Sequence, residues 1–290
     1  MRDLTRHIIE LIRLTSTSLP ADVESALASS YKCDQEDSTS KKVLGAILEN
    51  IKIARKESVP LCQDTGTPIF FVRFPTEYKM IHLTRMIRAA VAEATANSYL
   101  RPNAVDGLSG VNSGNNLGEK HFPSIHFEEI EGDGITIDLL LKGGGCENVG
   151  RQYTLPDMTL NAGRDLDGVR KAALDAVFHA QGQGCAPGFL GIAVGGDRGT
   201  SYLASKEVFT EKVGSHHTDP EIVELEKRIT RDANELMIGP MGFGGKPTIL
   251  GTRITGAHRL PASFFVSISY MCWAYRRRRL TIFGENFEIS

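Results

Sequence analysis

The sequence predicts an α/β fold, with a mixed sheet flanked by helices, in a single large domain of residues 1–290 whose N-terminal part, about residues 1–60, is helical. Three observations predict it. Apolar residues recur at helical spacing in several long segments, and short apolar runs of strand length lie between Gly, Pro and Asn residues. No repeat, low-complexity tract or linker divides the chain, which is long enough to bury a substantial core.

Helices are predicted from apolar periodicity and from helix-start signals. The clearest start is Thr218-Asp219-Pro220, which offers a capping side chain followed by Pro in the first turn. The predicted helices cover residues 4–14, 42–55 and 80–99, a segment from Asp165 or Asp167 to Ala180, and a segment that begins at residue 220.

Strands are predicted where short apolar runs end in turn residues. Between the first two of them, residues 101–120 are crowded with Asn and Gly, which predicts a loop longer than a plain connection needs. Ordered loops of this length are often functional. The predicted strands cover residues 68–74, 124–129, 135–141, 189–194, 248–254 and 263–271.

Composition argues against several classes of protein. The formal net charge of −2 and pI near 6.5 give no reason to expect nucleic acid or an anionic membrane as partner. No run approaches the ~18 apolar residues of a membrane span, and the N-terminus lacks the apolar core of a secretory signal. Five cysteines are an odd number for a disulfide framework, which favours a reducing, cytoplasmic location. The basic run at residues 276–279 is interpreted as a solvated edge or a partner-facing patch.

Three cysteines, Cys62, Cys185 and Cys272, each lie at a bend beside an apolar run. Thiolates presented in this way suit a soft metal centre, and three ligands would leave one iron of a four-iron cluster open to substrate. No C-x-x-C motif supports this, and a single cysteine is commonly a small buried hydrophobe, so a structural module without metal stays an alternative. Cys33 lies in a polar stretch and receives no role, and Cys146 could face the site without binding metal.

Polar residues near these cysteines could bind an anion. Gln63 and Asp64 directly follow Cys62, and an arginine such as Arg101 can hold a carboxylate through two parallel hydrogen bonds. The glycines at 143–145 can bring backbone N–H groups close to a small anion. The alternatives are a surface salt bridge for Arg101 and tight turns for the glycines.

Together these motifs resemble those of the α subunit of class I, iron–sulfur fumarate hydratases and of the related L(+)-tartrate dehydratases. The similarity covers nearly the whole chain, in ordered blocks that chance would rarely produce. The shared blocks are residues 62–67, 100–105, 112–118, 142–145, 184–185, 238–242 and 261–273.

The resemblance implies a [4Fe–4S] cluster with one open iron, a small dicarboxylate substrate and a β subunit that supplies the other half of the active site. The open iron would act as a Lewis acid, while arginines neutralise the carboxylates. The implied cluster ligands are Cys62, Cys185 and Cys272; the implied catalytic residues are Asp64, Gln63 and Arg101, which also contact the dicarboxylate together with the backbone of Gly144.

The resemblance further implies a hydro-lyase that reversibly hydrates fumarate to malate. An L(+)-tartrate dehydratase α subunit is the alternative, because Cys146 is a feature of tartrate enzymes whereas Thr67–Phe71 looks like the fumarases. One departure raises an alternative of another class. Where the family has Arg-His-Pro, this chain has Arg259-Leu260-Pro261, and leucine cannot relay a proton. A non-catalytic, cluster-binding subunit is therefore also considered, although reduced activity is the prediction.

Overall fold

The computed structural model describes residues 3–290 and divides them into two compact units, each built from segments distant in sequence. The first unit contains the residues up to Pro20, Glu49–Gly144 and Arg276–Ser290; the second contains Ala21–Leu48 and Gly145–Tyr275. Each unit holds one mixed sheet. The predicted α/β class with helices flanking mixed strands is confirmed, and the behaviour of the two units as one domain stays a prediction.

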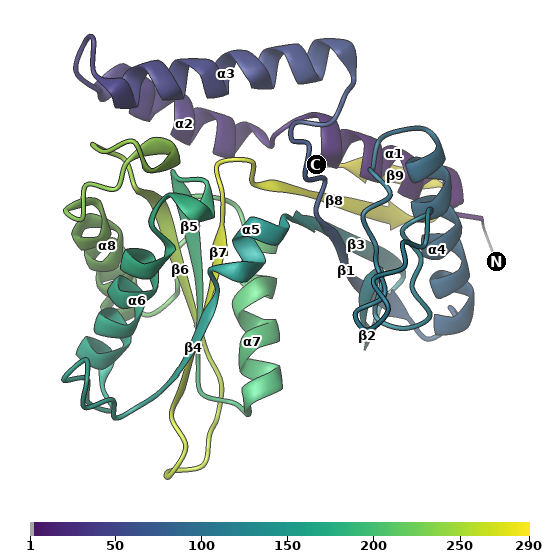
Figure 1. Cartoon of the computed structure of the whole chain (residues 1–290). Coiled ribbons are helices and arrows are strands. Elements are labelled where there is room, and N and C mark those ends of the chain that lie inside the picture. The colour runs from purple at the N-terminus through teal and green to yellow at the C-terminus, as the bar shows by residue number, and fades with distance from the viewer. Residues whose placement is uncertain (1–2) are drawn as a thin grey trace. The chain divides into compact units, whose positions relative to one another are not determined.

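The first unit is built on a five-stranded sheet of order β2-β1-β3-β8-β9, in which only β1 and β2 run parallel (Figure 1). Helices α1 and α4 pack on each other, and their buried apolar residues share a core with β1, β3 and β8. The elements are α1 (Thr5–Thr17), β1 (Thr67–Pro75), α4 (Met80–Ala96), β2 (Ser124–Ile130), β3 (Gly134–Lys142), β8 (Arg276–Phe283) and β9 (Asn286–Ile289). Helix α3 (Thr39–Glu57) begins in the second unit and ends in the first.

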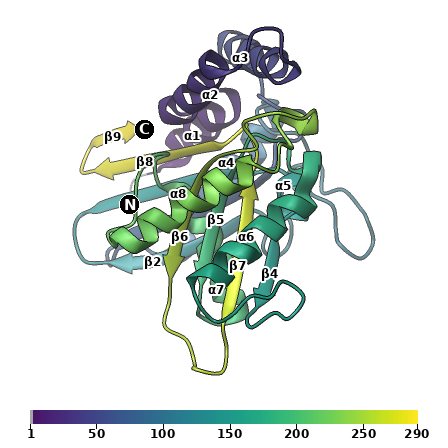
Figure 2. The ribbon, with the colours of Figure 1, turned by 90° about the vertical axis from the view of Figure 1, so that its left-hand side faces the viewer.

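The second unit is built on a four-stranded sheet of order β4-β7-β5-β6, with β5 and β6 parallel. Helices α6 and α8 lie over one face of this sheet and α7 lies over the other (Figures 1 and 2). The elements are α2 (Ala21–Cys33), α5 (Gly144–Asn148), β4 (Arg151–Thr154), α6 (Leu166–Ala180), η1 (Gln181–Gly184), β5 (Gly188–Val194), α7 (Arg198–Glu207), η2 (Val208–Thr210), α8 (Pro220–Asn234), η3 (Pro240–Gly242), β6 (Ile249–Gly256) and β7 (Phe265–Met271).

The predicted helix starts are confirmed in atomic detail. Asp219 caps α8 by accepting a hydrogen bond from the Glu221 N–H at 2.9 Å, and Pro220 occupies the first turn. Of the two capping candidates for α6, Asp165 is the one that accepts from the Gly168 N–H, at 2.7 Å. A side-chain oxygen here satisfies a donor that the helix itself leaves without a partner.

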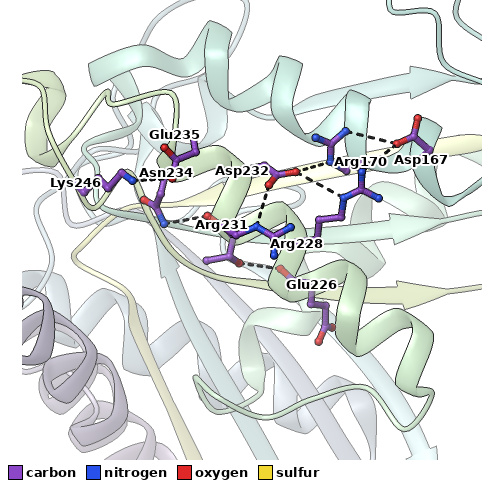
Figure 3. Close-up of polar contacts among 10 residues, drawn as sticks. Asp167, Arg170, Glu226, Arg228, Arg231, Asp232, Asn234, Glu235 and Lys246 are labelled. Carbon is purple, nitrogen blue, oxygen red and sulfur yellow. Dashed lines mark hydrogen bonds and ion pairs between the residues drawn. The ribbon is translucent and has the colours of Figure 1, made fainter.

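Charged side chains link α6 to α8 (Figure 3). Asp232 of α8 accepts a hydrogen bond from the Arg170 Nε of α6 at 2.6 Å, and Arg231 Nε lies 3.3 Å from the same carboxylate. Arg170 also lies 3.5 Å from Asp167, in the first turn of α6. These pairs cover the outer side of a contact whose inner side is apolar.

The polar sequence of α7 hides a buried surface. Ser201 and Ser205 of α7 are fully or nearly fully buried and bond Ser267 and Ser269 of β7 at 2.7 and 2.8 Å. The alternate residues of β7 face the apolar core that α6 and α8 cover. Strand β7 therefore has one apolar and one hydroxyl-lined face, as the two-residue period of a strand allows.

Of the two interpretations of the arginine run, the solvated edge is wrong, and the partner-facing patch stays a prediction. Residues 276–279 form the first half of β8, which pairs with β3 on one side and β9 on the other. Arg276 is 1% exposed and Arg277 is 7% exposed, and Arg279 binds both carboxylate oxygens of Asp138. Among residues 3–290, no helix is both long and apolar enough to cross a membrane.

Candidate active site

In the first unit, the predicted Asp64 lies in a turn that enters β1, and it is bound on both sides by backbone N–H groups. Its Oδ1 accepts from the Gly66 N–H at 3.0 Å, and its Oδ2 accepts from the Gly144 N–H at 2.7 Å. Asp64 and Gly144, which the resemblance implies both contact the dicarboxylate, therefore lie side by side. The N–H of Gly144 that the resemblance assigns to substrate is occupied here by the protein's own carboxylate.

Glycine is required at the centre of this turn. Gly66 has a φ of 82°, and a Cβ there would lie 2.8–2.9 Å from the backbone of Lys142 at the end of β3. A left-handed backbone and so close an approach both exclude an ordinary side chain. This packing brings the Asp64 turn against the start of the Gly143–Gly144 segment.

Arg101 reaches the same turn from the Asn- and Gly-rich loop. Its backbone N–H donates to Thr65 Oγ1 at 3.1 Å, and its Nη1 lies 3.4 Å from the Gln63 carbonyl oxygen. Arg101 itself is exposed. The structure thus brings the predicted residues Gln63, Asp64, Arg101 and Gly144 together within one unit.

Asn116 orders the predicted loop, and the sequence did not single it out. Its side chain is 3% exposed and makes four hydrogen bonds. The Oδ1 accepts from the N–H groups of Asn103 and Ala104, and the Nδ2 donates to the Arg101 carbonyl and to Thr95 Oγ1. An asparagine amide can satisfy both donors and acceptors, so one side chain fixes the loop base that carries Arg101.

Arg276 is a second residue that the sequence did not assign to the site. Its Nη1 donates to the carbonyl oxygen of Asp64 at 2.8 Å, so a side chain of β8 holds the backbone of the turn. Lys142, at the end of β3, is also fully buried. For Lys142 a signal was available, because it directly follows the apolar run at residues 135–141 that the pattern places in a strand.

The predicted cluster ligands divide between the units. Cys62 belongs to the first unit, where it is half-buried and directly precedes Gln63. Cys185 and Cys272 belong to the second, where the Trp273 N–H donates to the Cys185 carbonyl at 3.2 Å and so joins their two segments. That all three thiols meet stays a prediction.

Cys185 lies at a bend of unusual shape. Its backbone is left-handed, with φ 53° and ψ 58°, and glycines stand on both sides at 184 and 188. A Cβ on either glycine would lie within 2.3–2.7 Å of the Tyr270 ring of β7, so the ring and the bend are in close contact. Burial raises the pKa of Tyr270 well above its usual value, and the charges of Cys146, Cys272 and Cys185 add to this rise. The Tyr270 phenol therefore stays neutral.

The donor set fits an iron–sulfur cluster. Cys185 is half-buried and Cys272 is 8% exposed, neither forms a disulfide, and a backbone hydrogen bond joins their two segments. Within residues 3–290, no three His, Cys, Asp or Glu side chains stand as ligands of one metal ion. Cluster thiolates bind different irons, so this finding concerns mononuclear sites.

Comparison with known proteins identifies the family. The family model described as fumarate hydratase (Fumerase) matches residues 5–281. Over 292 aligned residues the chain is 46% identical to a Geobacillus stearothermophilus protein named as a class I fumarate hydratase; the match takes in all of this chain but only 57% of that protein.

Two relatives of similar length carry another name. The chain is 36% identical over 276 residues to a Methanocaldococcus jannaschii protein named as an L(+)-tartrate dehydratase subunit alpha, covering 93% of this chain and 94% of that one. It is 30% identical over 284 residues to the L(+)-tartrate dehydratase subunit alpha of Escherichia coli K12, covering 97% and 91%. The predicted resemblance is confirmed, and the chain belongs to the fumarate hydratase (Fumerase) family.

Proposed function

We propose that this chain is the α-type part of an iron–sulfur hydro-lyase that reversibly hydrates fumarate to malate. One observation carries the proposal: the residues expected to hold a dicarboxylate gather at a single turn, where Asp64 bonds Gly144 and Arg101 lies against Gln63. The names of the relatives support the reaction class. The first of them extends well beyond the matched part, so a β-type partner or segment is proposed to complete the site.

The roles of the residues follow from their chemistry. The Arg101 guanidinium and the Gly144 N–H would hold and neutralise one substrate carboxylate, which eases removal of the proton on the neighbouring carbon. Gln63 offers an uncharged amide for the substrate's polar oxygens. Asp64 would exchange its bond to Gly144 for substrate and then hold or move a proton at Oδ2.

The cofactor completes the proposal. Cys62, Cys185 and Cys272 would hold a [4Fe–4S] cluster. A reducing compartment such as the cytoplasm would keep these cysteines from forming disulfides. When bound, the cluster would supply Lewis acidity for a carbon–oxygen bond that is made or broken.

The same geometry supports a second substrate. L(+)-tartrate has the two carboxylates of malate and one further hydroxyl. The two relatives matched over nearly their whole length bear its name. Leu260 motivates the third candidate, a cluster-binding subunit without activity.

The deciding experiment is anaerobic coexpression with a β-type subunit, reconstitution with iron and sulfide, and assay on fumarate, malate and L(+)-tartrate. Turnover of fumarate supports the proposal, and turnover of tartrate alone selects the second candidate. The third candidate, a non-catalytic subunit, predicts cluster absorbance without either reaction. This result counts only if the same β-type subunit is active with another α subunit. An Asp64→Asn variant is the control for a background enzyme.

A further inference from the structure

Arg276 carries a buried positive charge that the described chain does not pair. The residue is 1% exposed, and within residues 3–290 its side chain makes one hydrogen bond, from Nη1 to the Asp64 carbonyl at 2.8 Å. Its Nε is buried without a hydrogen-bond partner, and among residues 3–290 no carboxylate forms an ion pair with it. A peptide carbonyl offers only a partial charge, so the guanidinium is left largely uncompensated.

Such an arrangement is costly for the folded state. Removing a charge from water is unfavourable unless an opposite charge and further hydrogen bonds replace the lost hydration. Arg279 in the same strand shows the usual solution, because its Nε and Nη2 bind the two oxygens of Asp138 at 2.7 and 3.0 Å. Arg279 therefore has a carboxylate partner within the protein, and Arg276 in the same strand forms no ion pair within residues 3–290.

The guanidinium faces the corner where the proposed substrate would bind. A Cβ at Gly143 would lie 3.7 Å from Arg276 Nη2 and 3.0 Å from Asp64 Oδ2, so both groups border the space that the missing side chain leaves. The next residue, Gly144, offers the N–H that Asp64 accepts from in this structure. A carboxylate already lies at this corner, and the cation behind it favours negative charge there.

We propose that Arg276 is a positioning residue for the bound dicarboxylate. Through the Asp64 carbonyl it holds the Gln63–Asp64 turn in place, and its unpaired charge stabilises a substrate carboxylate seated against Gly144. The inference rests on the proposed function, since it takes a dicarboxylate as the ligand. It assigns a binding role to a side chain that never touches the substrate.

Two measurements on the whole chain test it. The first is urea unfolding of Arg276→Met and of the matched Arg279→Met. For Arg276→Met, removing an uncompensated charge offsets the loss of the hydrogen bond to the Asp64 carbonyl, so the midpoint stays close to that of wild type, whereas breaking the Asp138 pair lowers it for Arg279→Met. A midpoint for Arg276→Met as low as that of Arg279→Met would show a merely structural role and would overturn the inference.

The second measurement is the rise of the unfolding midpoint with added fumarate, with its uncharged diamide as the control probe. Fumarate protects the wild type and Arg279→Met, while Arg276→Met binds it about tenfold more weakly, because the attraction of one nearby positive charge is lost. Arg276→Lys restores most of the protection because it restores the charge. The diamide protects none of them.

The outcomes separate the two proposals. If fumarate protects Arg276→Met as well as wild type, the role of Arg276 fails and the dicarboxylate function stands. If fumarate protects no form of the chain, dicarboxylate binding by this chain and the role of Arg276 fail together.

Discussion

Gly66 shows how much of the site depends on a single missing side chain. In Gly66→Ala the new Cβ would meet the Lys142 backbone at 2.8–2.9 Å from a backbone with φ of 82°. We expect a loss of roughly 3 kcal/mol in the free energy of unfolding. Gly110→Ala is the control, because Gly110 has a similar φ of 70° but a Cβ added there would have no atom within 4 Å. This variant should lose only about 1 kcal/mol of unfolding free energy. Urea unfolding of both variants measures the difference, and equal losses would show that the close approach is unimportant.

Leu260 stands where the resemblance implies a histidine. It is 75% exposed in the loop between β6 and β7, so Leu260→His should fold as well as wild type. An imidazole can exchange protons at neutral pH, and general acid–base catalysis contributes about 10²–10⁴-fold, so we expect turnover to rise at least about tenfold.

The assay for Leu260→His is initial-rate hydration of fumarate by the reconstituted complex. Leu260→Gln is the control for polarity, since an amide does not exchange protons at neutral pH, and it should leave turnover unchanged. A rate for the histidine variant equal to that of wild type would mean that proton transfer does not depend on this position.

At the scale of elements, the α6–α8 pair depends on one carboxylate (Figure 3). Burial acts to raise the pKa of Asp232, but hydrogen bonds and charges from Arg170 and Arg231 outweigh it and leave the pKa below its ordinary value of 3.8. The stability that this lowering contributes is present above pH 3.8 and is lost as pH falls through the folded-state pKa.

Asp232→Asn should therefore lose about 1 kcal/mol of unfolding free energy at pH 7, and the deficit relative to wild type should shrink toward about pH 2. Urea unfolding across this pH range gives the curve. Asp167→Asn, whose carboxylate is 48% exposed, is the matched control and should lose less. A deficit for Asp232→Asn that does not change with pH would contradict the ion-pair explanation.

Elements were predictable from sequence where local chemistry and packing agree. The α8 start at Asp219-Pro220 is read from capping chemistry alone, and β1 and β3 from apolar runs. Helix α7 has no apolar stripe because Ser201 and Ser205 bury hydroxyls, so periodicity could not reveal it. Strand β8 opens with four arginines, and only pairing with β3 and the Asp138 carboxylate makes a buried strand of them.

In the candidate site, the motif residues could be predicted from the sequence, but the residues that support them could not. The motif residues Gln63, Asp64, Arg101 and Gly144 were named from the sequence, and the first unit brings them together. Asn116 and Arg276 were not, because their roles come from hydrogen bonds to backbone atoms of residues far along the chain. No local pattern encodes a partner of that kind.

At the scale of the whole molecule, the three proposed cluster ligands come from segments far apart in the chain. Cys62→Ser should therefore reduce bound iron in the anaerobically reconstituted protein as strongly as Cys185→Ser or Cys272→Ser, to about a third of the wild-type amount or less. Cys33→Ser is the matched control because Cys33 is exposed and outside the proposed set. Iron content and cluster absorbance measure the effect, and full iron in Cys62→Ser would remove that residue from the ligand set.

The order in which the first sheet is assembled has a consequence for synthesis. Strand β3 lies between β1 and β8, yet β8 leaves the ribosome only after the whole of Gly145–Tyr275 has followed β3. Until Arg276–Ser290 emerges, β3 has an open edge whose backbone groups can pair with another nascent chain. A premature stop after Tyr275 would make that exposure permanent, and such a fragment should accumulate as aggregates.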